Sequence, residues 1–583
     1  MRHSPTLDRE PRVGGRGSGV SRERSSGASA VLGSWHQRAT LALAAILIAY
    51  YVLSEWLAPL PYYSMKYDPE MPYFINSLAL LKGVPYAFID HPGTPVEVLG
   101  TVMLALTRPW TRSMGALFIP YHLENPQVFL AMAHGFLTVA SVACLLLLAR
   151  RAVEVGSRRG IVAASAVAVA FYAVHPEAAF QTLTTWSHNS FAFPAGTLLL
   201  LGLVARLRRK EAVTPGEGML AGVLSGLLTA VQLYFFAWGA GVITALVVQA
   251  WLRREAWMAV GRKAAASLAG VGLGFFIGFA PVMHRFREFY LWVDRLVFHQ
   301  GRFGFGPEGI TTAGVWLDHL ELLSRQTPWP FVASGIIVGA VLTAMWLRRR
   351  SLRDRAGWWA ACLGLLVQLG LLWAVIGKHP GRVYLLAVAA VIPLLLALAL
   401  EALIAEGGRW PFVATGLGAL VLAAFAAGWV TSAMNHIRKV DHVARIERAI
   451  EQQVLAYAHR VGKDPEELDI VWAYGSPSRC YALRFGNLAA GIALEDEIDS
   501  VCDHEWVYEV WGRYAMIGGR NETLAGNTEW DVAIIPVRFR PPVAGRVGEI
   551  LDTGIESEGY GNILIVTPLA KWPEEGLPDD GAE

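Results

Sequence analysis

The stretch that decides the fold is ATLALAAILIAYYVLSEWLAPL at residues 39–60, followed closely by YDPEMPYF at residues 67–74. The first segment is apolar over about 20 residues, which is the length that a helix needs to cross a membrane. The second segment places two carboxylates, Asp68 and Glu70, just beyond that helix. This order predicts a membrane-spanning helix with acidic groups at its exit, where chemistry at the bilayer surface would take place.

The composition agrees, because 54% of the 583 residues are hydrophobic and only 17% are charged. We therefore predict an all-α polytopic membrane protein with about eleven transmembrane helices. The run 217–252 is too long for one helix, and its interruption at Gln232 and Tyr234 fits two short helices that meet at an outer turn. The predicted spans lie near 39–60, 127–149, 159–174, 190–206, 217–234, 235–252, 264–284, 329–347, 356–376, 381–402 and 409–431.

Lys and Arg gather in five alternate segments on one side of the membrane. By the positive-inside rule that side is cytoplasmic, so the N-terminus is cytoplasmic and the C-terminal region is extracytoplasmic. We expect a multi-pass protein of a bacterial inner (plasma) membrane. The net charge of +2 gives no argument for nucleic acid as a partner. The basic segments are the N-terminus, 150–159, 206–210, 253–263 and 348–355.

Charged residues return after residue 431, and short apolar runs there are typical of buried strands. We predict a small extracytoplasmic α/β domain that opens with an amphipathic helix at 438–460. Its strands are DIVWAY (469–474), VAIIP (532–536) and ILIV (563–566). The predicted domains are a disordered basic tail (1–38), a transmembrane domain (39–431) whose outer loop 61–126 carries interfacial helices, the α/β domain (432–570) and a flexible acidic tail (571–583).

Cysteine use follows this division. Cys144 and Cys362 fall inside apolar spans, where we expect them to be buried as small hydrophobic residues. Cys480 and Cys502 both lie in the outer region, where a disulfide between them is compatible with an oxidising compartment. The alternative is two unpaired buried thiols.

The outer loop after the first span contains a predicted amphipathic helix, Pro72–Lys82, which Gly83 ends and which lies in the membrane interface. Asp68 has two interpretations, as a functional carboxylate or as the N-cap of a helix that begins at Pro69. Asp68 and Glu70 are two residues apart and cannot both cap, so one of them needs another role.

These residues carry a resemblance to a known family. The acidic pair after the first span, GVPY at 83–86, HPGTP at 91–95 and KHPGRVYLL at 378–386 resemble motifs of the GT-C superfamily of membrane glycosyltransferases. Protein O-mannosyltransferases and the lipid A aminoarabinose transferase are members. The resemblance covers roughly residues 40–400, and it leaves the sugar and the acceptor open.

The resemblance implies a polyprenyl-phosphate sugar as donor and an acceptor hydroxyl on a saccharide, lipid or protein. This agrees with the chain, which has no nucleotide-binding motif of the Walker A or Gly-x-Gly-x-x-Gly type. Asp68 would act as general base on the acceptor, and Glu70 would orient the acceptor or tune Asp68. Some members use a divalent cation and others do not, so no cofactor is assigned; we assign no metal to the acidic cluster at 495–499, which we interpret as a solvated face.

The departing lipid phosphate requires cations, and Lys378 and Arg382 stand together at the outer end of a span. The alternative is that both merely reach the lipid headgroups, as most cations at helix ends do. His379 and His91 are secondary candidates for the same role. Tyr73, His188 and Arg302 complete the predicted substrate-binding set. His188 could equally be an interfacial residue, and Arg302 lies in a segment, 285–328, that is either a flexible lid or a plain linker.

The sequence thus predicts a membrane glycosyltransferase that moves a sugar from a lipid-linked donor to an acceptor hydroxyl. The alternative is a transporter or flippase of lipid-linked saccharides. A transporter predicts functional charges deep within the spans, whereas the polar residues here gather at the outer ends. A third interpretation, a sensor or assembly protein, would leave the outer loops without a shared site.

Overall fold

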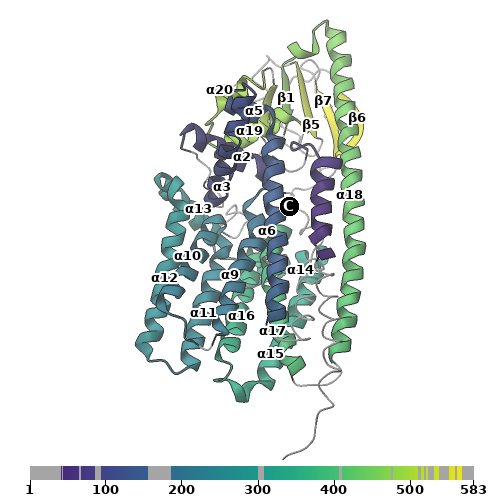
Figure 1. The fold of residues 1–583 in the computed structure, drawn as a ribbon. Coiled ribbons are helices and arrows are strands. Elements are labelled where there is room, and N and C mark those ends of the chain that lie inside the picture. Colours follow the sequence, from purple (N-terminus) through teal and green to yellow (C-terminus); the bar gives the residue numbers. More distant parts are fainter. Residues whose placement is uncertain are drawn as a thin grey trace, which may run out of the picture.

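The structure is a computed structural model. It describes residues 41–42, 44–64, 67–85, 89, 93–154, 185–209, 211–299, 308–405, 410–473, 477–503, 505–509, 514–517, 520–522, 531–536, 550–557 and 561–566. The two predicted tails and the predicted span 159–174 lie outside these residues. The chain forms a long helical bundle with a β-sheet at one end (Figure 1).

Six helices in the described part of the chain are long and apolar enough to cross a membrane. The chain is therefore a helical membrane protein, and the count of eleven spans stays a prediction. Shorter apolar helices occupy Ala44–Leu57, Pro215–Val231 and Leu385–Ala399. The bundle consists of α6 (Pro126–Glu154), α9 (Ala192–Leu207), α10 (Pro215–Val231), α11 (Phe236–Leu252), α12 (Trp257–Phe279), α15 (Trp329–Leu347), α16 (Ala356–Lys378), α17 (Leu385–Ala405) and α18 (Trp410–Val461).

The long apolar run at 217–252 forms two helices, α10 and α11. Gln232 separates them with an extended backbone (φ −156°, ψ 129°), and a 3-10 turn, η3 (Leu233–Phe235), leads into α11. The break puts Gln232 and Tyr234 in the protein interior, because both side chains are buried. The interruption in the sequence therefore marks a turn between helices.

Glycines allow α10 and α12 to touch along their backbones. A Cβ atom added at Gly222 or Gly226 would collide with the carbonyl groups of Ser267 and Val271 on α12. Small residues at such positions let helices in membranes approach closely and gain dispersion contacts, since apolar burial alone drives little association within lipid. This tight pair forms one wall of the bundle (Figure 1).

The outer loop 61–126 folds into four helices between the bundle and the sheet. They are α2 (Tyr67–Lys82), α3 (Thr94–Leu106), α4 (Arg108–Ser113) and α5 (Phe118–Glu124). The prediction for Pro72–Lys82 is wrong in two respects. The helix already begins at Tyr67, so Asp68 is its second residue and not a cap before Pro69. In addition, residues 70–79 are buried throughout, so α2 is an internal helix and not an amphipathic helix with one exposed face.

The sheet at the end of the bundle has seven strands in the order β4-β3-β2-β1-β5-β7-β6. The central strand β1 pairs in parallel with β2 and β5, while the outer pairs are antiparallel. The three predicted strands are neighbours in this sheet as β1, β5 and β7. The strands are β1 (Ile470–Ala473), β2 (Glu505–Glu509), β3 (Tyr514–Ile517), β4 (Arg520–Glu522), β5 (Val532–Pro536), β6 (Ile550–Ser557) and β7 (Gly561–Val566).

The predicted domain boundary at 431/432 falls inside a helix. The 52-residue helix α18 runs without a break from Trp410 to Val461, so it joins the predicted last span to the predicted amphipathic helix. The sequence changes there from apolar to charged, but both parts favour helix. A change of polarity alone therefore did not mark a change of structure.

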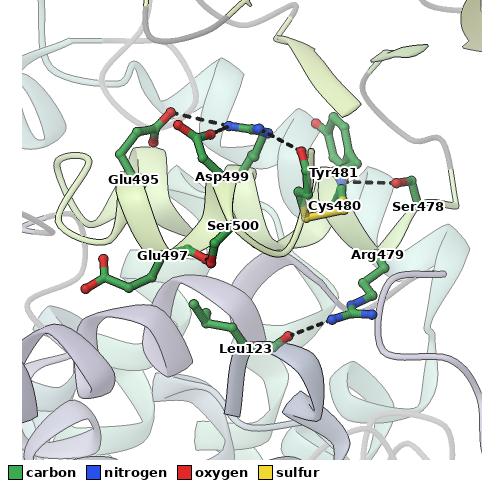
Figure 2. The surroundings of a disulfide bond; sticks show 11 residues. Leu123, Ser478, Arg479, Cys480, Tyr481, Glu495, Glu497, Asp499 and Ser500 are labelled. Atoms are coloured by element: carbon green, nitrogen blue, oxygen red, sulfur yellow. Dashed lines mark hydrogen bonds and ion pairs between the residues drawn. A yellow bond between two sulfur atoms is a disulfide. The ribbon is translucent and has the colours of Figure 1, made fainter. Parts of the chain in front are cut away.

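Two short helices of the sheet region, α19 (Arg479–Ala489) and α20 (Glu495–Asp499), bind it to the outer helices. The structure joins Cys480 of α19 to Cys502 in a disulfide, with their Cα atoms 5.5 Å apart. Figure 2 shows this region, in which Arg479 donates to the carbonyl oxygen of Leu123 in α5 over 3.5 Å. Lys82 at the end of α2 forms a 2.6 Å ion pair with Glu497.

The acidic cluster at 495–499 is thus not a plain solvated face. Arg484, whose side chain is buried, contacts Glu495 over 3.3 Å and Asp499 over 2.8 Å (Figure 2). With the Lys82–Glu497 pair, three of its acids hold α20 against its neighbours. The two Arg484 pairs hold α20 to α19 within the sheet region, and the Lys82–Glu497 pair attaches that region to α2.

The segment 285–328 contains two helices, α13 (Phe286–Phe298) and α14 (Ala313–Gln326). Thr312 caps α14 by accepting a hydrogen bond from the Val315 amide, as its residue type favours. The glycine-rich stretch 300–307 between the two helices, with Arg302, lies outside the described residues, so the lid and the linker both stay predictions.

Substitution of Gly486 tests the contact between α19 and α2. A Cβ atom at Gly486 would lie 2.8 Å from the backbone of Met71. We expect Gly486→Ala to cost about 1–3 kcal/mol because a buried backbone must shift. Thermal unfolding and limited proteolysis of the purified protein measure this. Gly202→Ala on α9, where a Cβ meets nothing within 4 Å, is the matched control; equal behaviour of the two variants would contradict the close contact.

His122 on α5 makes stability depend on pH. Its side chain is fully buried against Thr107, 2.8 Å away, and burial lowers its pKa to about 4 from the usual 6.5. The unfolded chain therefore takes up a proton first, and stability falls as the pH drops from 6.5 toward 4. Between pH 7 and 5 we expect a loss of about 2 kcal/mol that His122→Gln does not show. Thermal midpoints at both pH values measure it, and parallel curves would contradict it.

Candidate functional site

A chain of buried hydrogen bonds crosses the ends of the bundle helices that face the sheet. The Tyr234 hydroxyl donates to Asn189 Oδ1 over 3.1 Å, and Asn189 Nδ2 lies 2.9 Å from His188 Nε2. His188 Nδ1 lies 2.6 Å from the Tyr73 hydroxyl. The chain brings together Tyr73 and His188, two of the predicted substrate-binding residues, from segments 115 residues apart.

The direction of these hydrogen bonds determines which ring nitrogen of His188 carries the proton. An amide nitrogen only donates, so His188 Nε2 accepts from Asn189. In a neutral imidazole the other nitrogen then carries the proton, and Nδ1–H donates to the Tyr73 oxygen. Every donor in the chain points toward Tyr73. This arrangement can hold the hydroxyl groups of a sugar, or pass a change in hydrogen bonding from one end to the other.

Two further segments meet the same chain. The ring of Tyr384, in η7 (Arg382–Tyr384), lies 5.4 Å from the ring of Tyr234. On the other side, Gly93 has a positive φ of 57°, and an added Cβ atom would lie 2.5 Å from the Tyr73 ring. The Gly93 amide donates to the carbonyl oxygen of Val231 over 3.2 Å. Gly93, the middle residue of the HPGTP segment, is therefore held between Tyr73 and the end of α10.

Glu70 has a second set of buried contacts beside this chain. Its Oε1 accepts from the Trp186 amide over 2.7 Å and lies 2.6 Å from His134 Nε2. His134 Nδ1 in turn lies 2.9 Å from Glu55 Oε1. The imidazole bridges two carboxyl groups, so either it carries two protons or one carboxyl keeps a proton. These contacts join α2, α6 and the segment that carries His188.

The cationic candidates lie at the outer end of α16. Lys378, half-buried, donates from Nζ to the carbonyl oxygen of Val297 at the end of α13. His379 follows it as a buried residue. The helix α14 covers this end of α16, because His319 Nδ1 lies 2.9 Å from the Gly377 carbonyl oxygen. Lys378 therefore sits where α13, α14 and α16 meet.

Several predicted residues cannot be placed in the same detail. Asp68 and Arg382 belong to α2 and η7 by their backbones, but their side chains lie outside the described part of the structure, as do His91 and Arg302 altogether. Among the described residues, no group of three or more His, Cys, Asp or Glu side chains is arranged to hold a metal ion.

Sequence reasoning missed the partners of Glu70. His134 lies in an apolar span and Glu55 in the last turn of the first one, and ionisable residues in such positions require partners. The ionisable residues within these spans indicated that partners exist, but the sequence did not indicate which residues pair. Tyr384 was quoted only as part of the KHPGRVYLL motif and Asn189 was not singled out, and the structure gives each a defined contact.

Removal of one hydroxyl tests the hydrogen-bonded chain. Tyr73→Phe leaves the ring in place but removes the acceptor of the His188 Nδ1–H group. We expect a cost of about 1–3 kcal/mol, because a buried donor loses its acceptor. Thermal unfolding in detergent measures it, with the exposed Tyr290→Phe on α13 as control. A Tyr73→Phe variant as stable as the control would rule out this bond.

No protein-family model, curated protein or solved structure matches this chain. The resemblance to the GT-C superfamily therefore depends on the sequence motifs alone.

Proposed function

We propose that this protein is a GT-C-like membrane glycosyltransferase. It moves a sugar from a polyprenyl-phosphate donor to an acceptor hydroxyl at the outer face of a bacterial inner membrane, by an inverting single displacement. One observation carries the proposal. One buried cluster brings together residues from separate motifs. Tyr73 contacts His188 and Gly93 directly, and Asn189 and Tyr234 connect His188 to Tyr384.

In this proposal Asp68 is the general base. It occupies the first turn of α2, the helix that presents Tyr73 to His188. It accepts the proton of the acceptor hydroxyl as the oxygen attacks the anomeric carbon, and the bond from that carbon to the lipid phosphate oxygen breaks. Glu70, held by Trp186 and His134, acts as a positioning residue that fixes the start of α2.

The leaving lipid phosphate needs positive charge at the headgroup level. Lys378 and Arg382 bracket the turn between α16 and α17, with His379 between them. They stabilise the phosphate as negative charge collects on it. His91 and Arg302 remain proposed as further contacts with the donor. A divalent cation could share this role, and metal dependence is a separate test.

The disulfide supports the orientation of this site. A Cys480–Cys502 bridge is typical of an oxidising compartment, and basic loops at the other end of the bundle favour the cytoplasm there. We therefore propose that the sheet region lies outside the cytoplasm, and we keep the prediction of about eleven spans. Helix α19 of the sheet region packs on α2, and we propose that this region binds the acceptor.

The test is sugar transfer by the purified protein in proteoliposomes, with radiolabelled polyprenyl-phosphate sugars extracted from a bacterial membrane. We expect Asp68→Asn to lower the rate by about 10²–10⁴-fold, as loss of a general base does. Asp318→Asn, an exposed outer acid on α14, is the matched control and should keep the rate. Transfer by Asp68→Asn near the wild-type rate would overturn the assignment.

The same assay separates the enzyme from a transporter. A glycosyltransferase releases free lipid phosphate and links the label to an acceptor. A flippase instead moves the intact donor between leaflets and leaves the sugar on its lipid. Movement without release would overturn the proposed function in favour of transport.

A further inference from the structure

A cleft of about 540 Å³ opens at the end of the bundle opposite the sheet. Figure 1 shows the turn between α15 and α16 at that end. The cleft is formed by the end of α9, the end of α11 and that turn. Six arginines line it, namely Arg208, Arg209, Arg253, Arg348, Arg353 and Arg355.

The positive charge of the cleft is only partly compensated. Two carboxylates, Asp354 and Glu401, also line it, which leaves an excess of four positive charges. Arginines spread over a cytoplasmic surface need no ligand, because the positive-inside rule explains them. Six guanidinium groups from three connections around one cleft repel one another, and a bound anion would relieve that repulsion.

Contacts within the protein hold part of this cluster in place. Arg208 binds Glu401 through two parallel hydrogen bonds of 2.7 Å. Arg348 is buried, donates to the carbonyl oxygens of Glu401 and Ala402, and has its guanidinium 5.1 Å from the Trp358 ring centre. These two form a fixed base, while Arg353 and Arg355 are exposed at its rim. A cleft whose floor is held by fixed arginines and whose rim carries exposed arginines is suited to a ligand of defined shape.

We propose that this cleft binds a phosphate-bearing anion at the cytoplasmic surface of the membrane. Guanidinium groups match the oxygens of phosphate with paired donors. Basic pockets between the ends of transmembrane helices are suited to lipid headgroups. The ligand is either the headgroup of an anionic lipid or a soluble phosphate. This site is separate from the proposed transferase site and does not depend on it.

The experiment uses the full-length protein, purified and delipidated in a neutral detergent. Dioctanoyl phosphatidylglycerol and inorganic pyrophosphate are titrated separately, and binding is followed by the shift in thermal midpoint and by native mass spectrometry. The test variant is Arg353→Gln with Arg355→Gln. The matched control is Arg349→Gln with Arg350→Gln, which removes the same charge from the same turn but does not line the cleft.

We expect the wild type to bind one of the probes, and the test variant to bind it about tenfold more weakly, because two charge-assisted contacts are lost. The control should stay within about twofold, as expected of exposed charges at a distance. Binding of the lipid alone identifies a headgroup site, and binding of pyrophosphate identifies a soluble ligand.

Three results would overturn the proposal. They are failure of the wild type to bind either probe, equal losses in the test and control variants, and an unchanged affinity in the test variant. The thermal midpoint of each variant without ligand shows whether it is folded. Arg353→Gln alone, which changes one exposed residue, provides the comparison if the double variant is unstable.

Discussion

The burial of the Glu70 carboxylate is the constraint on which the outer half of the structure depends. A carboxyl group in an apolar interior costs several kcal/mol unless it is paired and hydrogen-bonded. Glu70 meets that condition through His134 on α6 and the amide of Trp186. Three segments that are distant in sequence must therefore meet at one point. Tyr73 lies three residues further along α2, and His188 lies two residues beyond Trp186, so their contact follows from the same constraint.

The sheet region depends on α2 in turn. Because α2 is covered on its outer side by α19 and on its inner side by the bundle, it has no face left for lipid. Gly486 and Gly93 permit two of these close contacts, one to the Met71 backbone and one to the Tyr73 ring. The sequence of α2 predicts an amphipathic helix, but α2 is internal because its less apolar side also packs against protein.

The sequence predicted the membrane helices well and the contacts between segments poorly. The apolar run 329–347 became α15 with the same bounds, and the strands at 532–536 and 563–566 became β5 and β7. Those features depend on local composition and periodicity. The bridge from Glu55 through His134 to Glu70 depends on packing between distant segments, and no local pattern encodes it. The site was predicted as a set of residues; among those whose side chains the structure describes, Tyr73 and His188 are in direct contact.

The unbroken helix α18 has a mechanical consequence. Its 52 residues, at 1.5 Å each, extend about 78 Å, more than twice the roughly 30 Å thickness of a bilayer core. The sequence predicts that residues 409–431 cross the membrane, and the rest of the helix runs on beside the sheet (Figure 1). A continuous helix has no joint at which a tilt can be absorbed. It therefore acts as a lever, by which a change of its angle in the lipid swings the far end beside the sheet.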